Sequence, residues 1–267
     1  MIGLFLGDTD FSEIVLKKIK KLKKKYFIID FSKNNKFKKD RNSHRISIGK
    51  FGKIIDLIKE KKSKKVLFAG KISKPKLSTL RLDLKGIYYM PNIIRASKKG
   101  DAAIIKAIIN ILSKENIKVI SSNYFNPELS LKYGIYTKIK PNKVDLQSIK
   151  KGIKYFDKLN NLDHVQALIV KDKKIIASES NKGTKNMILK LKKGSKGILI
   201  KFPKKKQDLR IDLPTIGLKT LKDCYNHGLK GIVLKSKKNI FLDKNKSIIF
   251  ANKYKIFIKV IWKKFSY

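Results

Sequence analysis

The sequence of 267 residues contains few of the residues that build several common kinds of site. Its single cysteine, Cys224, excludes an internal disulfide and a zinc cage of several thiolates. The three histidines, His44, His164 and His227, have no metal-ligand spacing and predict neither a zinc centre nor a Ser-His-Asp triad. Cys224 falls in a predicted helix, where we expect a buried apolar position and not a nucleophile.

Long apolar runs and nucleotide-binding signatures are also missing. No apolar run reaches the length of a transmembrane helix, and the N-terminal segment lacks the basic start and cleavage site of a signal peptide, so we expect a cytosolic protein. Gly7-Asp8-Thr9-Asp10 follows the first apolar run, but it is neither G-x-G-x-x-G nor a P-loop. The sequence therefore has no fingerprint for a dinucleotide or a nucleoside triphosphate.

Arginine is scarce although the net charge is +46. Of the 66 basic residues, five are arginine: Arg41, Arg45, Arg81, Arg95 and Arg210. Proteins that read nucleic-acid sequence rely on arginine for bidentate contacts, and the lysines here are spread over the whole chain. We therefore expect no specific nucleic-acid partner. Such a surface instead attracts anionic lipid headgroups and polyphosphates without sequence specificity.

The apolar pattern predicts an α/β protein with two domains. In residues 1–130, short apolar runs alternate with helical patterns, which predicts a three-layer, Rossmann-like domain with a parallel sheet. Gly7 and Gly70 mark strand-to-helix loops on the usual ligand edge of such a sheet. The irregular residues 131–145 are the expected linker. Residues 146–267 predict a second α/β domain with mixed strands, including a hairpin over 165–178.

The segment Gln207–Gly217 contains two carboxylates and an arginine in a lysine-rich background. Polar and apolar positions alternate from Asp208 to Leu213, which predicts a strand with Asp208, Arg210 and Asp212 on one face. In such a strand the two aspartates lie roughly 13 Å apart, too far to chelate one small cation together. We assign the chemistry to Asp212, at the predicted strand end, and an anion-binding role to Arg210. The alternative is an edge strand whose charged face forms only structural ion pairs.

Pro214 and Thr215 mark the end of that predicted strand. Pro214 cannot donate to a sheet, and Thr215 is a good N-cap for a helix over residues 216–226. Strand ends beside helix N-termini often bind phosphate.

Two other short segments are candidates for binding. Gly100-Asp101 opens a predicted helix over residues 102–114, where Asp101 is either an N-cap or a ligand. Glu179, followed by Gly183-Thr184, predicts either a phosphate-binding loop or a plain turn.

Together these segments resemble the LpxI-type UDP-2,3-diacylglucosamine pyrophosphatases of lipid A biosynthesis. The matching pieces occur in the family's order: Gly49-Lys50-Phe51-Gly52-Lys53, Phe68-Ala69-Gly70-Lys71 with Pro75, Lys99-Gly100-Asp101, Asp163 with Gln166, Ala177 and Glu179 with Gly183-Thr184, Gln207 through Gly217, and Gly228-Leu229 with Gly231-Ile232. The stretch from Arg210 to Gly217 is the most specific of them.

The resemblance implies a hydrolase that depends on a divalent cation, Mg²⁺ or Mn²⁺, and encloses its substrate with two domains. It would split UDP-2,3-diacylglucosamine into UMP and 2,3-diacylglucosamine 1-phosphate (lipid X), with attack on the β-phosphorus favoured. Asp212 falls on the family's essential aspartate and is the expected metal ligand, with Arg210 as a second catalytic residue. The expected substrate-binding residues are Gly70, Lys71, Gly100, Asp101, Gln166, Glu179, Gly183, Thr184, Gln207, Asp208 and Thr215.

The resemblance also implies a cytoplasmic protein on the periphery of the anionic inner membrane, with a homodimer as one allowed assembly. The sequence departs from the family's pattern at Asp8, where a second glycine is usual, and at Ala102, Lys182 and Lys185, where acids are usual. Two alternatives therefore remain: a non-catalytic polyanion- or lipid-binding protein, and a degenerate pyrophosphatase that binds substrate with little turnover.

Overall fold

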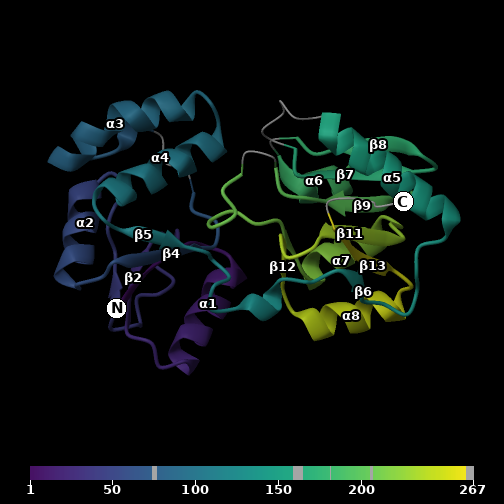
Figure 1. The fold of residues 1–267 in the computed structure, drawn as a ribbon, viewed down its shortest axis with the longest axis horizontal. Coiled ribbons are helices and arrows are strands. Elements are labelled where there is room, and N and C mark those ends of the chain that lie inside the picture. The colour runs from purple at the N-terminus through teal and green to yellow at the C-terminus, as the bar shows by residue number, and fades with distance from the viewer. Residues whose placement is uncertain (74–76, 159–164, 181, 205–206, 263–267) are drawn as a thin grey trace. The chain divides into compact units, whose positions relative to one another are not determined.

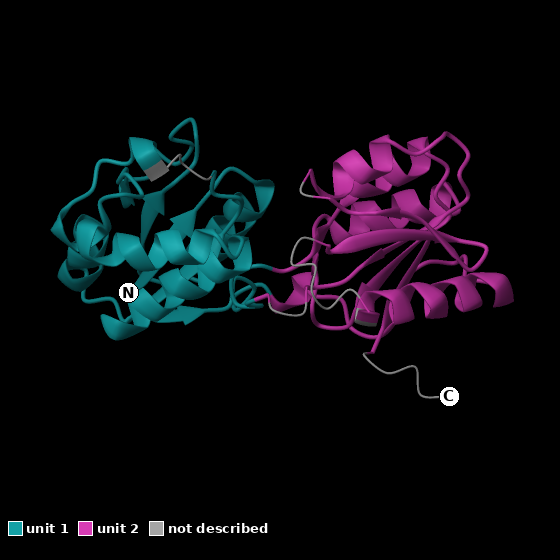
Figure 2. Cartoon of the chain, turned by 90° about the horizontal axis from the view of Figure 1, so that it is seen from above, with its two compact units in different colours: residues 1–126, 208–212 teal, residues 127–207, 213–267 magenta. Residues whose placement is uncertain are grey.

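The computed structural model describes residues 1–73, 77–158, 165–180, 182–204 and 207–262. The chain divides into two compact units (Figure 2). Unit 1 contains residues 1–126 and 208–212, and unit 2 contains residues 127–207 and 213–267. Both are built from helices and strands, so the predicted α/β class is confirmed. Residues 131–145 lie within unit 2, where they include β6 and the start of α5.

The sheet of unit 1, sheet A, has the strand order β3-β2-β1-β4-β5 with every pairing parallel. Its strands are β1 (Ile2–Leu6), β2 (Tyr26–Asp30), β3 (Ser43–His44), β4 (Lys65–Ala69) and β5 (Lys118–Ile120). This is the order of a Rossmann-like sheet, and the direction in which successive strands are added reverses between β1 and β4. In open parallel sheets, ligands bind where the strand order reverses, at the carboxyl ends of the strands.

Helices cover both faces of sheet A (Figure 1). They are α1 (Asp10–Lys21), α2 (Phe51–Glu60), α3 (Leu84–Ser97) and α4 (Asp101–Lys114), with a 3₁₀ turn η1 (Leu77–Thr79). One core cluster joins α2, α3 and α4 to the sheet through side chains such as Phe5, Ile55 and Leu112. On α1, Val15 and Ile19 are fully buried, at the spacing of one helical turn.

Helix α3 was not predicted, because Gly86 and Pro91 both weaken a helical pattern. Its start is fixed by Asp83, whose carboxylate accepts backbone hydrogen bonds from Gly52 (3.0 Å), Lys53 (3.0 Å) and Gly86 (2.8 Å). Burial alone would raise the pKa of Asp83, but these three donors hold it below its ordinary value. One carboxylate thus caps α3 and ties it to the first turn of α2.

Unit 2 contains a six-stranded sheet, sheet B, with the order β6-β13-β11-β9-β7-β8. Its strands are β6 (Gly134–Ile135), β7 (Ala167–Lys171), β8 (Lys174–Ser178), β9 (Ile198–Lys201), β11 (Gly231–Lys235) and β13 (Phe257–Ile261). The central strands β9, β11 and β13 are parallel, and β7, β8 and β6 pair in antiparallel fashion at the two edges. Two further strands, β10 (Thr215–Ile216) and β12 (Ile240–Phe241), pair with each other.

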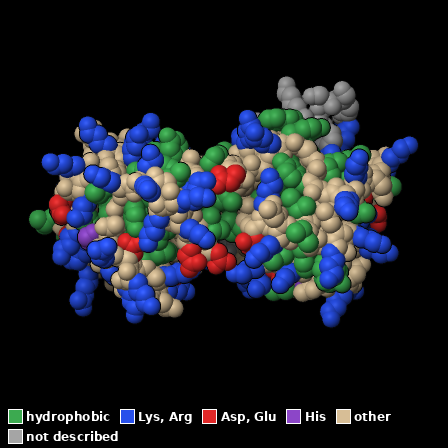
Figure 3. All heavy atoms as spheres, turned by 90° about the horizontal axis from the view of Figure 1, so that it is seen from below, with side chains coloured by type: hydrophobic (Ala, Val, Ile, Leu, Met, Phe, Trp, Pro, Cys, Tyr) green, Lys and Arg blue, Asp and Glu red, His purple; other side chains and the backbone are tan. Residues whose placement is uncertain are grey.

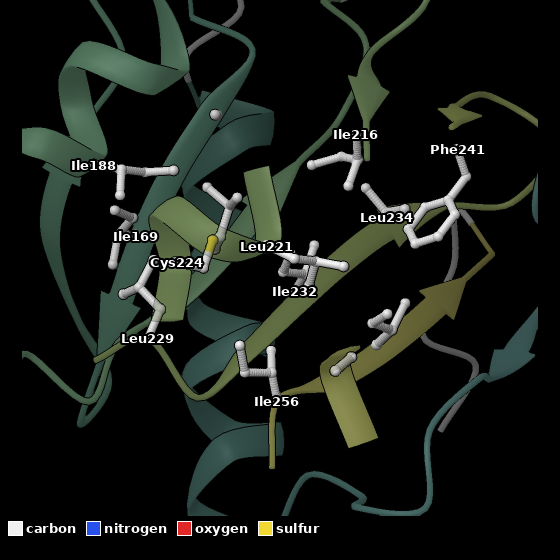
Figure 4. Packing of buried hydrophobic residues seen from close by; sticks show 14 of the residues in the cluster. Ile169, Ile188, Ile216, Leu221, Cys224, Leu229, Ile232, Leu234, Phe241 and Ile256 are labelled. Atoms are coloured by element: carbon white, nitrogen blue, oxygen red, sulfur yellow. The ribbon is translucent and has the colours of Figure 1, made fainter. Parts of the chain in front are cut away.

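The helices of unit 2 lie on both faces of sheet B. They are α5 (Lys143–Lys158), α6 (Gly183–Leu189), α7 (Leu218–Asn226) and α8 (Lys244–Lys253), with a 3₁₀ turn η2 (Pro127–Leu129). Cys224 on α7 is fully buried in the cluster that α6, α7 and α8 form on one face of the sheet (Figure 4). Ile149 of α5 packs on the other face against Leu168 and Ile200. The predicted buried position of Cys224 is confirmed, and burial raises the pKa of its thiol far above the ordinary value.

The lysines lie over the surfaces of both units. The face in Figure 3 shows Lys and Arg side chains scattered among other residues, with no single basic stripe. In the part of the chain that the structure describes, no helix combines the length and the apolar character needed to span a bilayer.

Candidate functional site

At the carboxyl edge of sheet A, backbone packs directly against backbone. The loops after β1 and β4 are joined by hydrogen bonds from the Gly7 amide to the Ala69 carbonyl and from the Asp8 amide to the Lys71 carbonyl, both 2.9 Å. The Ser12 hydroxyl lies 2.9 Å from the Gly7 carbonyl oxygen and 2.8 Å from that of Ala69. These contacts fix the two loops at the point where the strand order reverses.

Glycine is required in both loops. Gly70 has φ +85°, and a Cβ at this position would lie 2.1 Å from the Ser12 hydroxyl oxygen. A Cβ on Gly7 would lie 2.3 Å from the carbonyl oxygen of Lys71. Gly70 and Lys71, two predicted binding residues, therefore lie on a rigid edge, with the Lys71 side chain exposed to solvent.

The predicted strand over Asp208–Leu213 is wrong. The backbone forms a turn in which the amides of Ile211 (3.2 Å) and Asp212 (3.0 Å) donate to the carbonyl of Asp208. The Asp208 carboxylate also accepts from the Arg210 amide (3.0 Å), a local bond that competes with sheet pairing. Asp208 and Asp212 are thus one turn apart, and the expected separation of roughly 13 Å along a strand does not apply.

The alternating apolar residues of this segment are divided between the two units. Ile211 packs on the main core cluster of unit 1, and the carbonyl of Arg210 accepts a hydrogen bond from the Ser122 amide (2.7 Å). Leu213 is buried within unit 2. The alternating pattern therefore does not mark a strand. It falls mainly on residues 208–212, a short segment of unit 1 that interrupts the sequence of unit 2.

Arg210 and Asp208 form a two-pronged ion pair. The Arg210 Nε donates to Asp208 Oδ1 (3.0 Å), and Nη2 donates to Oδ2 (2.7 Å). The hydrogen bonds from Arg210 hold the pKa of Asp208 below its ordinary value, and the same bonds raise the pKa of Arg210. The Arg210 side chain is still 47% exposed, so its guanidinium is held in a fixed orientation with part of its surface open to solvent.

The Gly100-Asp101 pair lies at the start of α4. Gly100 is the N-cap with φ +101°, and Asp101 is the first helical residue, so the predicted N-cap role of Asp101 is off by one position. A Cβ on Gly100 would meet no atom within 4 Å, so the backbone conformation, and not crowding, favours glycine here. Asp101 lies in the first turn, where a helix favours negative charge.

Side chains at the carboxyl end of β9 in unit 2 form a buried polar network. The Glu179 carboxylate accepts hydrogen bonds from the backbone amide of Gln166 (2.8 Å) and from the Thr184 hydroxyl (2.8 Å). The Gln166 side chain donates to Gln207 Oε1 (3.0 Å), which also accepts from the Lys204 amide (2.8 Å). Four predicted binding residues, Gln166, Glu179, Thr184 and Gln207, are thus brought together.

One atom of this network has no assigned hydrogen-bond partner. The Nε2 of Gln207 is buried and has no partner among the described residues, although Gln207 is only 8% exposed. A buried donor of this kind costs free energy unless something accepts from it.

Residues 183 and 215 flank this network. Gly183 begins α6 with φ +84°, which is consistent with the plain turn considered above. Thr215 lies in β10, and Gly217 is the N-cap of α7, so the predicted capping role of Thr215 is wrong. The Thr215 hydroxyl instead lies 3.1 Å from the Leu213 carbonyl oxygen.

Lys201 lies near this network and was not among the residues predicted from the sequence. It is 9% exposed at the end of β9, and its Nζ donates to the Thr215 carbonyl (3.1 Å). Its signal in the sequence is a lysine inside the apolar run Ile198–Phe202, in a chain where most lysines are exposed. It places a cation next to the polar network.

No preformed metal cage is found in the described residues, because no group of three or more His, Cys, Asp and Glu side chains lies together there. Mg²⁺ is usually held by one or two carboxylates, water and substrate phosphates. Both oxygens of Asp208 accept hydrogen bonds from Arg210, and Asp212 also has an interaction partner. A metal-binding role for Asp212 therefore stays a prediction.

Comparisons with known proteins identify the family. The LpxI N-terminal domain matches residues 1–129, and the LpxI C-terminal domain matches residues 132–259. A relative from Caulobacter vibrioides, named UDP-2,3-diacylglucosamine pyrophosphatase LpxI, is 29% identical over 223 residues, which cover 80% of each chain. Two domains of one family, matched in order along the chain, show that the protein belongs to the LpxI family.

Proposed function

We propose that the protein hydrolyses the pyrophosphate bond of UDP-2,3-diacylglucosamine to UMP and lipid X. The observation that carries this proposal is the match of both LpxI domains along the chain, together with a relative named for this activity. The structure adds two sets of polar groups at sheet edges, of a kind that could bind a charged nucleotide lipid. The enzyme would act on the anionic inner-membrane surface that holds its substrate.

We assign the hydrolytic step to Asp212. Water adds to the β-phosphorus, the bond to the bridging oxygen breaks, and that oxygen leaves with UMP. Asp212 would either accept the proton from the attacking water or ligate the divalent cation. A bound Mg²⁺ would neutralise charge on the two phosphates. The Asp208 carboxylate would hold the Arg210 guanidinium toward the same charge, through the two hydrogen bonds that join them.

We assign substrate recognition to the polar network of unit 2 and to the glycine loops of unit 1. Gln166 and Lys204 both donate to the side-chain oxygen of Gln207, which fixes the orientation of this amide. Its buried Nε2 would then donate to an acceptor on the substrate. Lys201 would contribute positive charge near that acceptor. In unit 1, Gly70, Lys71, Gly100 and Asp101 would present backbone groups and charge at helix and strand ends.

Release of UMP is the direct test of the proposal. Purified protein is incubated with UDP-2,3-diacylglucosamine and Mg²⁺ or Mn²⁺ in water enriched in ¹⁸O, and the products are analysed by mass spectrometry. We expect UMP and lipid X, with the label in the lipid X phosphate. No UMP with either metal, beside retained substrate binding, would support the degenerate-enzyme alternative. Label in UMP would overturn the assignment of the attacked phosphorus.

Asp212→Ala tests the assigned role. A carboxylate that acts chiefly in the transition state should cost about a thousandfold in kcat when removed, roughly 4 kcal/mol, while substrate still binds. The matched control is Asp56→Ala, which removes an exposed carboxylate from α2 and should leave kcat unchanged. An active Asp212→Ala enzyme, with folding checked by circular dichroism, would refute the mechanism.

A further inference from the structure

The outer face of α3 exposes a stripe of large apolar side chains. Leu84 is 86% exposed, Tyr88 72%, Ile87 58% and Ile94 41%. Pro91 is also exposed. These positions are separated by three or four residues, so they lie on one side of the helix and form one surface.

The opposite side of α3 is also apolar and supplies the packing that holds the helix. Tyr89 is buried, and its ring meets that of Phe51 edge to face, with centroids 6.1 Å apart. Ile93 packs on the core cluster of unit 1. A helix on a protein surface normally has a polar outer face, and one that is apolar on both sides is normally covered on both. The outer face of α3 thus departs from the pattern of a solvated helix.

Polar contacts at the inner side keep α3 in place. Glu115, just after α4, accepts from Lys59 (2.7 Å), Lys85 (3.2 Å) and the Tyr89 hydroxyl (3.1 Å). The hydrogen bond from Lys59 is the main cause that lowers the pKa of Glu115. Together with the cap from Asp83 at the start of the helix, these bonds to its first two turns fix which face of α3 points outward. The apolar stripe is therefore a fixed part of the surface of the folded unit.

Basic residues flank the apolar stripe along the chain. Arg81 precedes the helix, and Arg95, Lys98 and Lys99 follow the stripe; all four are exposed. Two of the five arginines of the protein thus lie beside this one helix. Asp83, just before the helix, has its carboxylate occupied by three backbone donors, and the acid nearest to Lys98 and Lys99 in sequence is Asp101 of α4. Apolar and aromatic side chains bordered by cations match the boundary between anionic headgroups and acyl chains.

We propose that α3 is the membrane-docking element of this protein. Leu84, Ile87 and Tyr88 would enter the outer acyl region of an anionic bilayer, and Arg95 and Lys98 would contact its headgroups. The docking is a property of unit 1 and does not require hydrolysis. It also differs from the weak adhesion expected of scattered lysines, because it depends on one named surface.

Sedimentation with vesicles that contain no nucleotide lipid tests the docking. The protein is mixed with vesicles of phosphatidylcholine alone or with phosphatidylglycerol added, and the partition coefficient is measured. We expect at least tenfold stronger binding to the anionic vesicles. The double variant Leu84→Ser/Tyr88→Ser should bind these at least tenfold more weakly than the wild type. The matched control is Ile249→Ser/Tyr124→Ser, which removes side chains 68% and 63% exposed elsewhere and should change binding less than twofold.

A second pair of variants tests the charge. Arg95→Gln/Lys98→Gln should weaken binding more than Lys17→Gln/Lys21→Gln, which removes the same charge from α1. Equal losses in the two pairs would mean that only net charge matters and would overturn the proposal.

Two other results would also overturn it. One is unchanged vesicle binding by Leu84→Ser/Tyr88→Ser. The other is a fall in molecular mass of that variant, measured by light scattering, because the face would then join two copies of the chain. Failure of UMP release would leave the vesicle result unaffected.

Discussion

The carboxyl edges of the two sheets are built in different ways. On sheet A, the loops after β1 and β4 are joined by backbone hydrogen bonds, and Gly7 and Gly70 leave no room for a side chain. On sheet B, the corresponding edge is filled by side chains, with Gln166, Glu179 and Gln207 linked through buried hydrogen bonds. The first edge depends on glycines, which have no side chain and let the backbones approach closely. The second edge depends on the hydrogen bonds that buried side chains donate and accept.

This difference predicts different sensitivities to substitution. An edge made of close backbone contacts should tolerate loss of polar groups but not gain of volume. An edge made of buried polar side chains should tolerate changes at its surface but not loss of one partner. The four predictions below run from the largest expected effect to the smallest, and the first and last of them test this comparison.

Gly70→Ala should lower the free energy of unfolding by about 2–4 kcal/mol, because the added methyl group would collide with Ser12 and the backbone has a positive φ. The matched control is Gly194→Ala, at φ +73° with no atom within 4 Å of the added Cβ, which should cost about 1 kcal/mol. Urea denaturation of both variants gives the two values. Equal losses would show that conformation alone, and not close packing, makes sheet A's edge sensitive.

Asp208→Asn and Arg210→Lys should each lower kcat/KM about ten- to a hundredfold, or about 1.4–2.7 kcal/mol, because each breaks the two-pronged pair that orients the guanidinium. The double variant should lose little more than the worse single variant. Additive losses would mean that the two side chains act separately. A kcat/KM for Arg210→Lys within twofold of the wild-type value would show that the pair is only a structural contact.

The Asp208–Arg210 pair should also leave a signature in acid. The folded pKa of Asp208 lies below its unfolded value of about 3.9, so its contribution to stability is present above pH 4 and is lost as pH falls through the folded pKa. The stability difference between wild type and Asp208→Asn should therefore shrink as pH falls below about 4. A difference that grows in that range would contradict the lowered pKa.

Thr184→Val should lower the free energy of unfolding by about 1–2 kcal/mol, because it keeps the shape of the side chain but leaves an oxygen of buried Glu179 without its 2.8 Å donor. Thr220→Val on α7 serves as the control and should cost less than about 0.5 kcal/mol. Thermal unfolding checks both. A neutral Thr184→Val would show that sheet B's edge does not depend on its hydrogen bonds.

The regular elements of the protein could be predicted from the sequence. Short apolar runs in residues 1–130 predicted a parallel sheet, and Ile2–Leu6 and Lys65–Ala69 form two neighbouring parallel strands of it. The helix α4 runs from Asp101 to Lys114, so it begins one residue before the predicted range 102–114 and ends where predicted. These elements follow from local hydrophobic periodicity, which tertiary contacts do not override here.

The predictions that depended on a partner segment were less successful. The alternation over Asp208–Leu213 indicates a strand, but a strand needs a neighbour with which to pair. The segment instead meets Ser122 and the core of unit 1, neither of which is near in sequence. Helix α3 was missed for a similar reason, since its cap Asp83 acts together with the distant Gly52. Of the candidate site, the sequence could identify Gln166, Glu179, Thr184 and Gln207, but not their hydrogen bonds or the buried Lys201.

The return of residues 208–212 to unit 1 has a consequence for synthesis of the protein. The ribosome releases residues 1–126 first, yet unit 1 cannot acquire its last segment until all of residues 127–207 have also been made. The surface near Ser122 and the part of the core that contacts Ile211 therefore stay partly exposed until residues 208–212 have been synthesised. Expression of the first 126 residues alone should give an incomplete and aggregation-prone product, and fusing residues 208–212 to that fragment through a short linker is the way to obtain unit 1 by itself.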